Sequence, residues 1–154
     1  GDPRDIHPRY KLPVARRLLR VAQKTAYGEE LVETGPLFRQ MRRFGDRIIL
    51  SFTRTGEGLE LRYDKDTLTG FAIAGEDQQF HWARAEVISP TEIAVYSEAV
   101  PKPVAVRYAW ADHPVISLYN SEGLPASPFR TDNWTWITRN GKYRFELPND
   151  FIPD

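Results

Sequence analysis

Residues 103–110 read Pro103-Val104-Ala105-Val106-Arg107-Tyr108-Ala109-Trp110, and this stretch decides the fold class. In an extended chain Val104, Val106 and Tyr108 fall on one face, whereas Ala105, Arg107 and Ala109 fall on the other. An apolar face that recurs at every second residue is typical of a strand with one side in a core. The stretch therefore predicts a half-buried strand of an antiparallel sheet.

Short apolar stretches of this kind recur after Thr34-Gly35-Pro36, with turn residues about every ten positions. Phe44-Gly45-Asp46-Arg47 predicts a tight hairpin, and residues 70–75 predict a short apolar strand. Asn140-Gly141 predicts a two-residue hairpin loop between residues 134–137 and 143–147. Many short strands at this spacing predict a mainly β fold, an antiparallel β-sandwich with a jelly-roll-like arrangement.

An amphipathic helix is predicted ahead of these strands. Val14, Leu18 and Val21 recur at helical spacing, Pro13 suits the first helical turn, and Gly28 is placed to end the helix. A helix of about 14 residues cannot bury its apolar stripe alone, so it needs a partner surface. We interpret it as the last helix of a different domain, which divides the chain into residues 1–33 and a β-sandwich domain of residues 34–154.

The composition excludes several classes of function. Lys+Arg and Asp+Glu each total 21, so the net charge is zero and we expect no nucleic-acid partner. The chain has no cysteine, which excludes disulfides and a thiol nucleophile. No apolar run reaches the length of a membrane span, so we expect no membrane partner. No phosphate loop, zinc signature or calcium-loop pattern occurs, and we expect neither a cofactor nor a metal.

Asp5 and His7 are the candidate catalytic residues. They lie in Asp5-Ile6-His7-Pro8, just ahead of the predicted helix. Histidine titrates close to neutral pH, which suits a general base, and a carboxylate can hold its ring in the required tautomer. The sequence alone leaves a simple turn as the alternative. No serine lies in a Gly-x-Ser-x-Gly or Gly-Asp-Ser turn, and we interpret His81 and His113 as surface or hydrogen-bonded histidines.

Two longer strings resemble the C-terminal signature of the sialate O-acetylesterases. They are residues 103–112 and the string Leu118-Tyr119-Asn120-Ser121-Glu122-Gly123-Leu124-Pro125-Ala126-Ser127-Pro128-Phe129-Arg130-Thr131-Asp132. Residues 5–8 and 70–75 are similar to the same family in content and order, so the resemblance covers roughly residues 1–134. It implies an SGNH-type (GDSL) α/β hydrolase domain followed by β-sandwich domains.

The resemblance implies that the chain is the C-terminal part of a serine esterase that removes O-acetyl groups from sialic acid or related sugars. His7 matches the catalytic base, and the nucleophilic serine is expected in an upstream hydrolase segment, in the same polypeptide or a second chain. Alone, the chain should then be inactive. The SGNH pattern usually has an Asp where Arg4 stands, so Asp5 is the available partner of His7. We expect the full-length protein to be secreted, periplasmic or lysosomal, although this chain does not show its localisation.

Two other interpretations stay open at this point. The domain could be a non-catalytic carbohydrate-binding or architectural β-sandwich, in which Trp82, Trp110, Trp134 and Trp136 either stack on sugars or pack in the core. It could also be a homo-oligomeric interaction domain, in which the apolar stripe of the predicted helix packs against a second copy of the chain.

Overall fold

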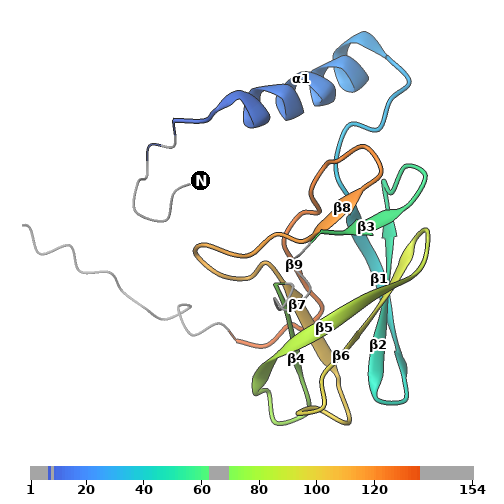
Figure 1. Cartoon of the computed structure of the whole chain (residues 1–154), viewed down its shortest axis with the longest axis vertical. Coiled ribbons are helices and arrows are strands. Elements are labelled where there is room, and N and C mark those ends of the chain that lie inside the picture. The colour runs from blue at the N-terminus through green and yellow to red at the C-terminus, as the bar shows by residue number, and fades with distance from the viewer. Residues whose placement is uncertain (1–6, 8, 63–69, 136–154) are drawn as a thin grey trace, which may run out of the picture.

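The computed structural model describes His7 and residues 9–62 and 70–135. Within these residues the chain forms one helix followed by short strands: α1 (Leu12–Tyr27), β1 (Leu37–Phe44), β2 (Arg47–Thr53), β3 (Leu59–Leu61), β4 (Phe71–Ala74), β5 (Phe80–Ser89), β6 (Glu92–Tyr96), β7 (Ala105–Tyr108), β8 (Leu118–Asn120) and β9 (Phe129–Arg130). Helix α1 crosses one end of the β-domain, near β3 and β8 (Figure 1). The hairpin predicted around Asn140-Gly141 lies outside the described residues.

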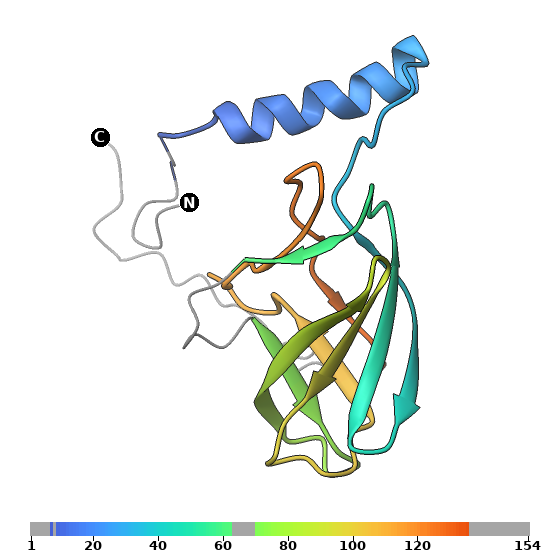
Figure 2. The same ribbon diagram turned by 45° about the vertical axis from the view of Figure 1, so that its right-hand side comes forward.

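Seven strands form one antiparallel sheet in the order β1-β2-β6-β5-β4-β7-β9, and β3 pairs with β8 in a small second sheet. Strand β5 joins the two halves of the larger sheet: Phe80 to Ala83 pair with β4, whereas Arg84 to Ser89 pair with β6. The sheet curls on itself along this strand (Figure 2). The predicted antiparallel β-sandwich is thus confirmed, as is the helix that precedes it.

The core follows from the alternation in the strands. Val106 and Tyr108 of β7 are fully buried, and their inward neighbours in other strands include Ile73, Ile93 and Leu50. Burying one side chain of this size stabilises a fold by about 1.5–3 kcal/mol. The Gly45-Asp46 turn pairs Phe44 with Arg47, as the hairpin prediction required, and Gly45 takes a left-handed φ of 61°.

The phenol of Tyr108 shows how a polar group is accommodated in this core. Its oxygen accepts hydrogen bonds from the backbone N–H groups of Ser117, at 3.0 Å, and Leu118, at 2.9 Å. Burial raises the pKa of Tyr108 above its ordinary value, and the two backbone bonds oppose this only in part. The phenol therefore stays neutral, and it fixes the point at which the loop after Trp110 enters β8 of the small sheet.

Helix α1 begins and ends where the sequence predicts. Pro13 lies in its first turn, and Gly28 ends it with φ 69° while the Glu29 N–H donates to the Gln23 carbonyl at 3.1 Å. None of its residues is buried. The guanidinium of Arg20 donates to the Val32 carbonyl of the segment before β1, at 2.9–3.1 Å, and joins α1 to the β-domain by donating to the Glu122 carboxylate, at 3.1 Å. The predicted division between residues 33 and 34 stays a prediction.

Candidate functional site

His7 lies exposed on the segment that leads into α1. Asp5 falls outside the described residues, so the predicted pair of Asp5 and His7 stays a prediction. Downstream of His7, the Lys11 N–H donates to the Arg9 carbonyl at 3.1 Å, and the Val14 and Ala15 N–H groups donate to the Lys11 carbonyl. These bonds start the helix at Leu12, a few residues after His7.

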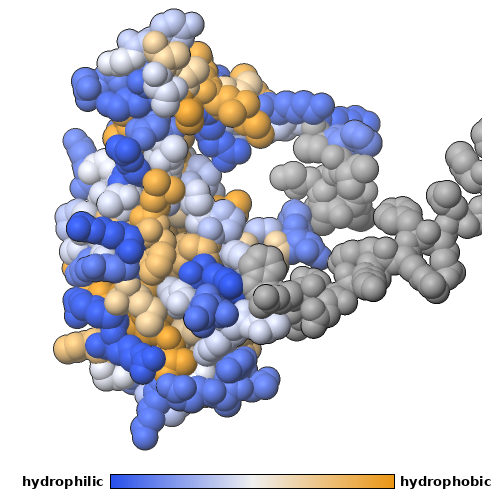
Figure 3. Space-filling model, turned by 180° about the vertical axis from the view of Figure 1, so that it is seen from behind, coloured by the Kyte–Doolittle hydropathy of each residue, from blue (hydrophilic) through white to orange (hydrophobic). Residues whose placement is uncertain are grey.

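The apolar stripe of α1 is largely exposed. Leu18 is 65% exposed, and Val14, Leu19 and Val21 also lie in part on the surface. Between α1 and the β-domain runs a groove of about 380 Å³, whose apolar lining includes Val14, Leu18, Val21, Ile116, Leu124 and Pro128. Apolar side chains gather along the helix and continue onto the domain below it (Figure 3). A helix with such a stripe needs a further surface to pack against.

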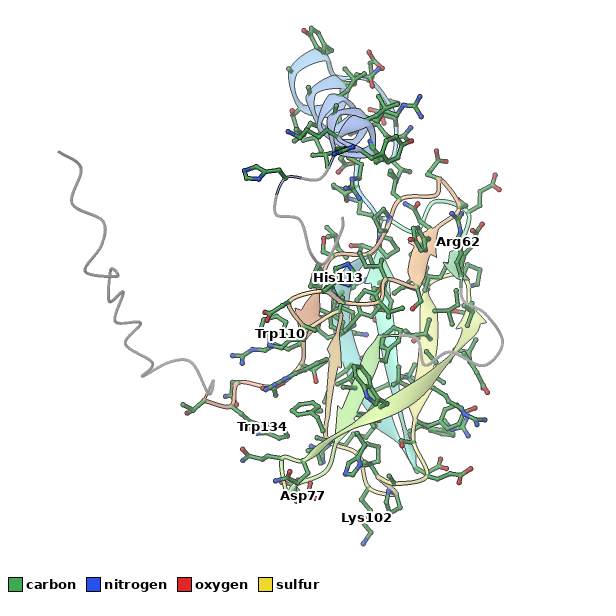
Figure 4. All side chains as sticks on the ribbon, turned by 60° about the vertical axis from the view of Figure 1, so that its left-hand side comes forward. Arg62, Asp77, Lys102, Trp110, His113 and Trp134 are labelled. Atoms are coloured by element: carbon green, nitrogen blue, oxygen red, sulfur yellow. The ribbon has the colours of Figure 1, made fainter. Side chains whose placement is uncertain are left out.

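A second, larger groove of about 830 Å³ lies on the outer face of the sheet, over β4, β5 and β7. Trp82 and Trp110 line it and are 61% and 43% exposed. Trp134 is half-buried, and Trp136 lies outside the described residues. Packing in the core therefore does not account for Trp82 or Trp110, and sugar stacking stays open for both. Trp110, His113 and Trp134 lie on the same side of the domain (Figure 4).

Strand register explains why this groove exists. Trp82 pairs with Ala72, Ala72 pairs with Arg107, and Arg107 pairs with Arg130, so the four side chains form one row across β5, β4, β7 and β9. Ala72 is the small member of the row, and Gly70 and Ala109 add to the floor of the groove. Because the floor is made of small residues, the larger side chains around it form walls.

Arg107 is held in place by a carboxylate. Its Nε and Nη2 donate to the two oxygens of Asp132 at 2.8 and 2.9 Å, and the Asp132 side chain is only 1% exposed. Burial alone raises the pKa of this carboxyl, but the hydrogen bonds and charge of Arg107 outweigh it and lower the pKa below its ordinary value. Arg130 lies 3.6 Å from the same carboxylate. The cluster thus holds two cations and one anion.

His81 and His113 both line this groove and are exposed. Among the described residues, no group of three or more His, Asp or Glu side chains is arranged to hold a metal ion. The part of the chain that the structure describes also contains no helix long and apolar enough to span a membrane.

Residues 118–132, which carry the family resemblance, serve the architecture of the domain. The buried amide of Asn120 donates to the carbonyls of Thr34 and Arg54, at 3.1 and 2.9 Å, and its oxygen accepts from the Leu124 N–H at 2.9 Å. The hydroxyl of Ser121 accepts a hydrogen bond from the Glu57 N–H at 2.9 Å. These contacts join three segments that are far apart in the sequence, so no local sequence pattern indicates them.

Comparison with known proteins places this fold. The chain matches no known protein family profile. A carbohydrate acetylesterase from Xanthomonas citri has a similar structure, with a TM-score of 0.80 and 44% identity over 87% of this chain and 31% of its own. The sialate O-acetylesterases of Rattus norvegicus and Mus musculus are 35% and 34% identical over 134 residues. That match covers 80% of this chain and 24% of theirs, so the chain spans about a quarter of the length of these relatives.

Fold and sequence together therefore relate the chain to the carbohydrate acetylesterases, a class of esterase-like hydrolases. More particularly, the chain is similar to a C-terminal part of the sialate O-acetylesterases, and the resemblance drawn from the sequence is confirmed.

Proposed function

We propose that this chain is the C-terminal portion of a serine carbohydrate esterase and contributes the catalytic base. An upstream SGNH hydrolase segment, in the same polypeptide or as a second chain, supplies the nucleophilic serine. The substrate is an O-acetylated sugar, sialic acid or a related one. One observation carries the proposal: His7 leads into a helix whose apolar stripe is exposed, as expected of an element that packs against a missing domain.

The proposed reaction is acyl transfer in two steps. His7 takes the proton of the serine hydroxyl as its oxygen attacks the acetyl carbonyl carbon. The bond from this carbon to the sugar oxygen then breaks, and His7 returns the proton to the sugar oxygen. In the second step His7 takes a proton from water as the water oxygen attacks the acetyl carbon. The bond from this carbon to the serine oxygen then breaks, His7 returns the proton to the serine oxygen, and acetate is released. Asp5 orients His7, and donors of the upstream segment stabilise the negative oxygen.

Esterase assays test the proposal directly. The chain should neither hydrolyse 4-nitrophenyl acetate nor react with a fluorophosphonate, whereas the longer protein with its upstream segment should do both. In that protein His7→Ala should lower kcat by at least about 100-fold, since a positioned base contributes roughly 10²–10⁴. Arg9→Ala, on the same segment, is the matched control. If the chain alone hydrolyses the ester and His7→Ala abolishes this, the nucleophile lies within the chain and the proposal is wrong. If His7→Ala leaves kcat of the longer protein unchanged, His7 is not the catalytic base.

A secreted, periplasmic or lysosomal location is part of this proposal. Fractionation of cells that express the full-length protein checks it, and recovery in the cytosol alone would contradict it. The alternative of a non-catalytic carbohydrate-binding module is favoured by one observation of its own, the exposure of Trp82 and Trp110. The two functions are compatible within one protein, because the groove and His7 lie on different elements.

A further inference from the structure

We propose that the outer groove over β4, β5 and β7 is a carbohydrate-binding site, in which Trp82 and Trp110 stack on pyranose rings. The proposal rests on the groove itself and does not depend on the proposed esterase function. Its volume of about 830 Å³ lies within the range of small-molecule sites, which are concave, mostly apolar and provided with a few polar groups. The chemistry of its floor, walls and polar groups supports this ligand class.

The walls suit the apolar face of a sugar. An indole ring carries negative charge density on its face and attracts the weakly positive C–H groups of a pyranose. Exposed tryptophans are uncommon, because indole burial stabilises the fold, so two of them around one groove call for a ligand or partner. The guanidinium carbon of Arg130 lies 5.7 Å from the Trp110 ring centroid, so a cation lies over one face of this ring.

Phe80 forms a further fixed wall. The guanidinium carbon of Arg107 lies 4.1 Å from the Phe80 ring centroid, and the Trp134 ring meets Phe80 edge-on at 5.6 Å. Arg107 is itself fixed by the two bonds to the buried carboxylate of Asp132. The wall is therefore formed before any ligand binds, and such preorganisation lowers the entropy cost of binding.

Polar groups suited to sugar hydroxyls surround these rings. Arg107 carries N–H donors beyond the two that Asp132 uses, and a neutral histidine ring offers one donor and one acceptor. His113 lines the groove from the loop after Trp110. Hydroxyl groups both donate and accept, so this mixed set fits a polyol better than it fits a purely apolar ligand.

The loop that carries His113 is fixed at both ends. A Cβ on Gly70 would lie 2.2 Å from the Val115 carbonyl oxygen, so only glycine permits this close approach, and Gly70 takes φ 74°. Ala109, at the start of the loop, has φ 51°, a left-handed conformation that costs energy in a residue with a Cβ. The close approach at Gly70 and the left-handed turn at Ala109 thus define the path of this loop.

Titration of the chain with two oligosaccharides tests the site. Xylohexaose is a neutral plant-type oligosaccharide, and 3′-sialyllactose is an acidic sialylated one. Comparing the two shows which type of glycan supplies the pyranose ring that binds. We expect at least one of them to shift the indole N–H signals of Trp82 and Trp110 saturably in NMR spectra. If neither binds the chain or the longer protein, the groove is a packing surface and the proposal is wrong.

Variants locate the binding. Trp82→Ala and Trp110→Ala should each raise Kd about tenfold or more, which corresponds to about 1.4 kcal/mol, and Trp82→Phe should recover part of the affinity. Ala72→Leu keeps both tryptophans but fills the floor, and should also weaken binding. Phe44→Ala removes an exposed ring outside the groove and is the control. Thermal unfolding confirms that each variant is folded. Wild-type affinity in both Trp82→Ala and Ala72→Leu would overturn the site.

Discussion

The rings of Phe38 on β1 and Phe129 on β9 stack with their centroids 4.8 Å apart and their planes inclined by 8°. These strands are the two edges of the seven-stranded sheet, so this contact closes the sheet on itself. Phe52 meets both rings edge-on, at 6.3 and 5.6 Å, and Tyr108 stacks on Phe129 at 5.6 Å. Among the described residues this contact is made by side chains alone, because β1 and β9 share no backbone hydrogen-bond ladder.

Phe129→Ala should therefore be among the costliest substitutions in the domain. It removes a buried ring with three aromatic neighbours, and a change of this type costs about 3–5 kcal/mol. Urea denaturation followed by circular dichroism measures the loss. Phe44→Ala, at a ring that is 64% exposed, is the matched control and should cost less than about 1 kcal/mol. Equal effects of the two substitutions would show that the stacked rings do not close the sheet.

Asn120→Ala should destabilise the domain by about 2–4 kcal/mol. The substitution leaves the Thr34 and Arg54 carbonyls and the Leu124 N–H without the side chain that satisfies them, and each orphaned buried group costs about 1–3 kcal/mol before relaxation. Asn133→Ala, at an exposed asparagine, is the control. A midpoint of denaturation that moves no further for Asn120→Ala than for this control would contradict the structural role.

Gly35→Ala tests the packing of the segment before β1 against residues 123–128. A Cβ at Gly35 would lie 1.8 Å from the Pro125 carbonyl oxygen, which is backbone and cannot rotate away. One of the two segments must shift, and overpacking of this kind costs about 1–3 kcal/mol. Gly58→Ala is the comparison, because its nearest neighbour lies at an ordinary 3.7 Å. We expect a lower Tm for Gly35→Ala than for Gly58→Ala, and the reverse order would refute the close contact.

The ion pair of Arg107 and Asp132 makes stability depend on acid. The pKa of Asp132 is lower in the folded protein, so the folded carboxylate is favoured, and the resulting stability is present above about pH 4, the ordinary range of an unfolded Asp. It is lost as pH falls through the lowered pKa. Asp132→Asn should cost about 1.5–3 kcal/mol at neutral pH, the worth of hydrogen bonds to charged groups.

The difference between wild type and Asp132→Asn should then shrink as the pH is lowered from 6 to 2. Asp46→Asn is the control, because Asp46 pairs with Arg47 at 3.4 Å on the surface, where such pairs are worth little. The measurement is the denaturation midpoint of wild type, Asp132→Asn and Asp46→Asn across this pH range. A difference that does not change with pH would show that Asp132 does not titrate in this way.

Local features of the fold could be predicted from the sequence, and distant ones could not. The Gly45-Asp46 turn depends on neighbouring residues and is confirmed, and Val106 and Tyr108 are buried as predicted. Ala105 and Ala109, predicted on the outer face, are buried as well, and Val104 is only half-buried. The stacking of Phe38 on Phe129 brings together residues far apart in the chain, for which no periodicity gives a register. The same holds for Arg107 and Asp132, so the fixed wall of the groove could not be recognised from the strand that carries Arg107.

The candidate sites show the same limit. Residue type alone suggests Trp82 and Trp110 as candidates, but the small neighbour of Trp82 on β4, Ala72, is known only from the strand register. His7 was identified from its place before a helix, and the sequence could not supply its partner groups, because those are expected in another segment. Residue type and local spacing therefore suggest chemistry, whereas the geometry that makes it work comes from contacts across the fold.

The apolar stripe of α1 should matter only when a partner surface covers it. Leu18→Ser removes an apolar side chain that is 65% exposed in this chain, so the free energy of unfolding of the chain should change by less than about 1 kcal/mol. In the longer protein, where the upstream segment is expected to bury Leu18, the same substitution should cost about 2–5 kcal/mol. Arg16→Ser, at an exposed polar position of the same helix, should be near neutral in both proteins. If Leu18→Ser costs little in the longer protein, the stripe does not face the hydrolase segment. If the chain forms a concentration-dependent dimer and Leu18→Ser dissociates it, a second copy of the chain covers the stripe instead.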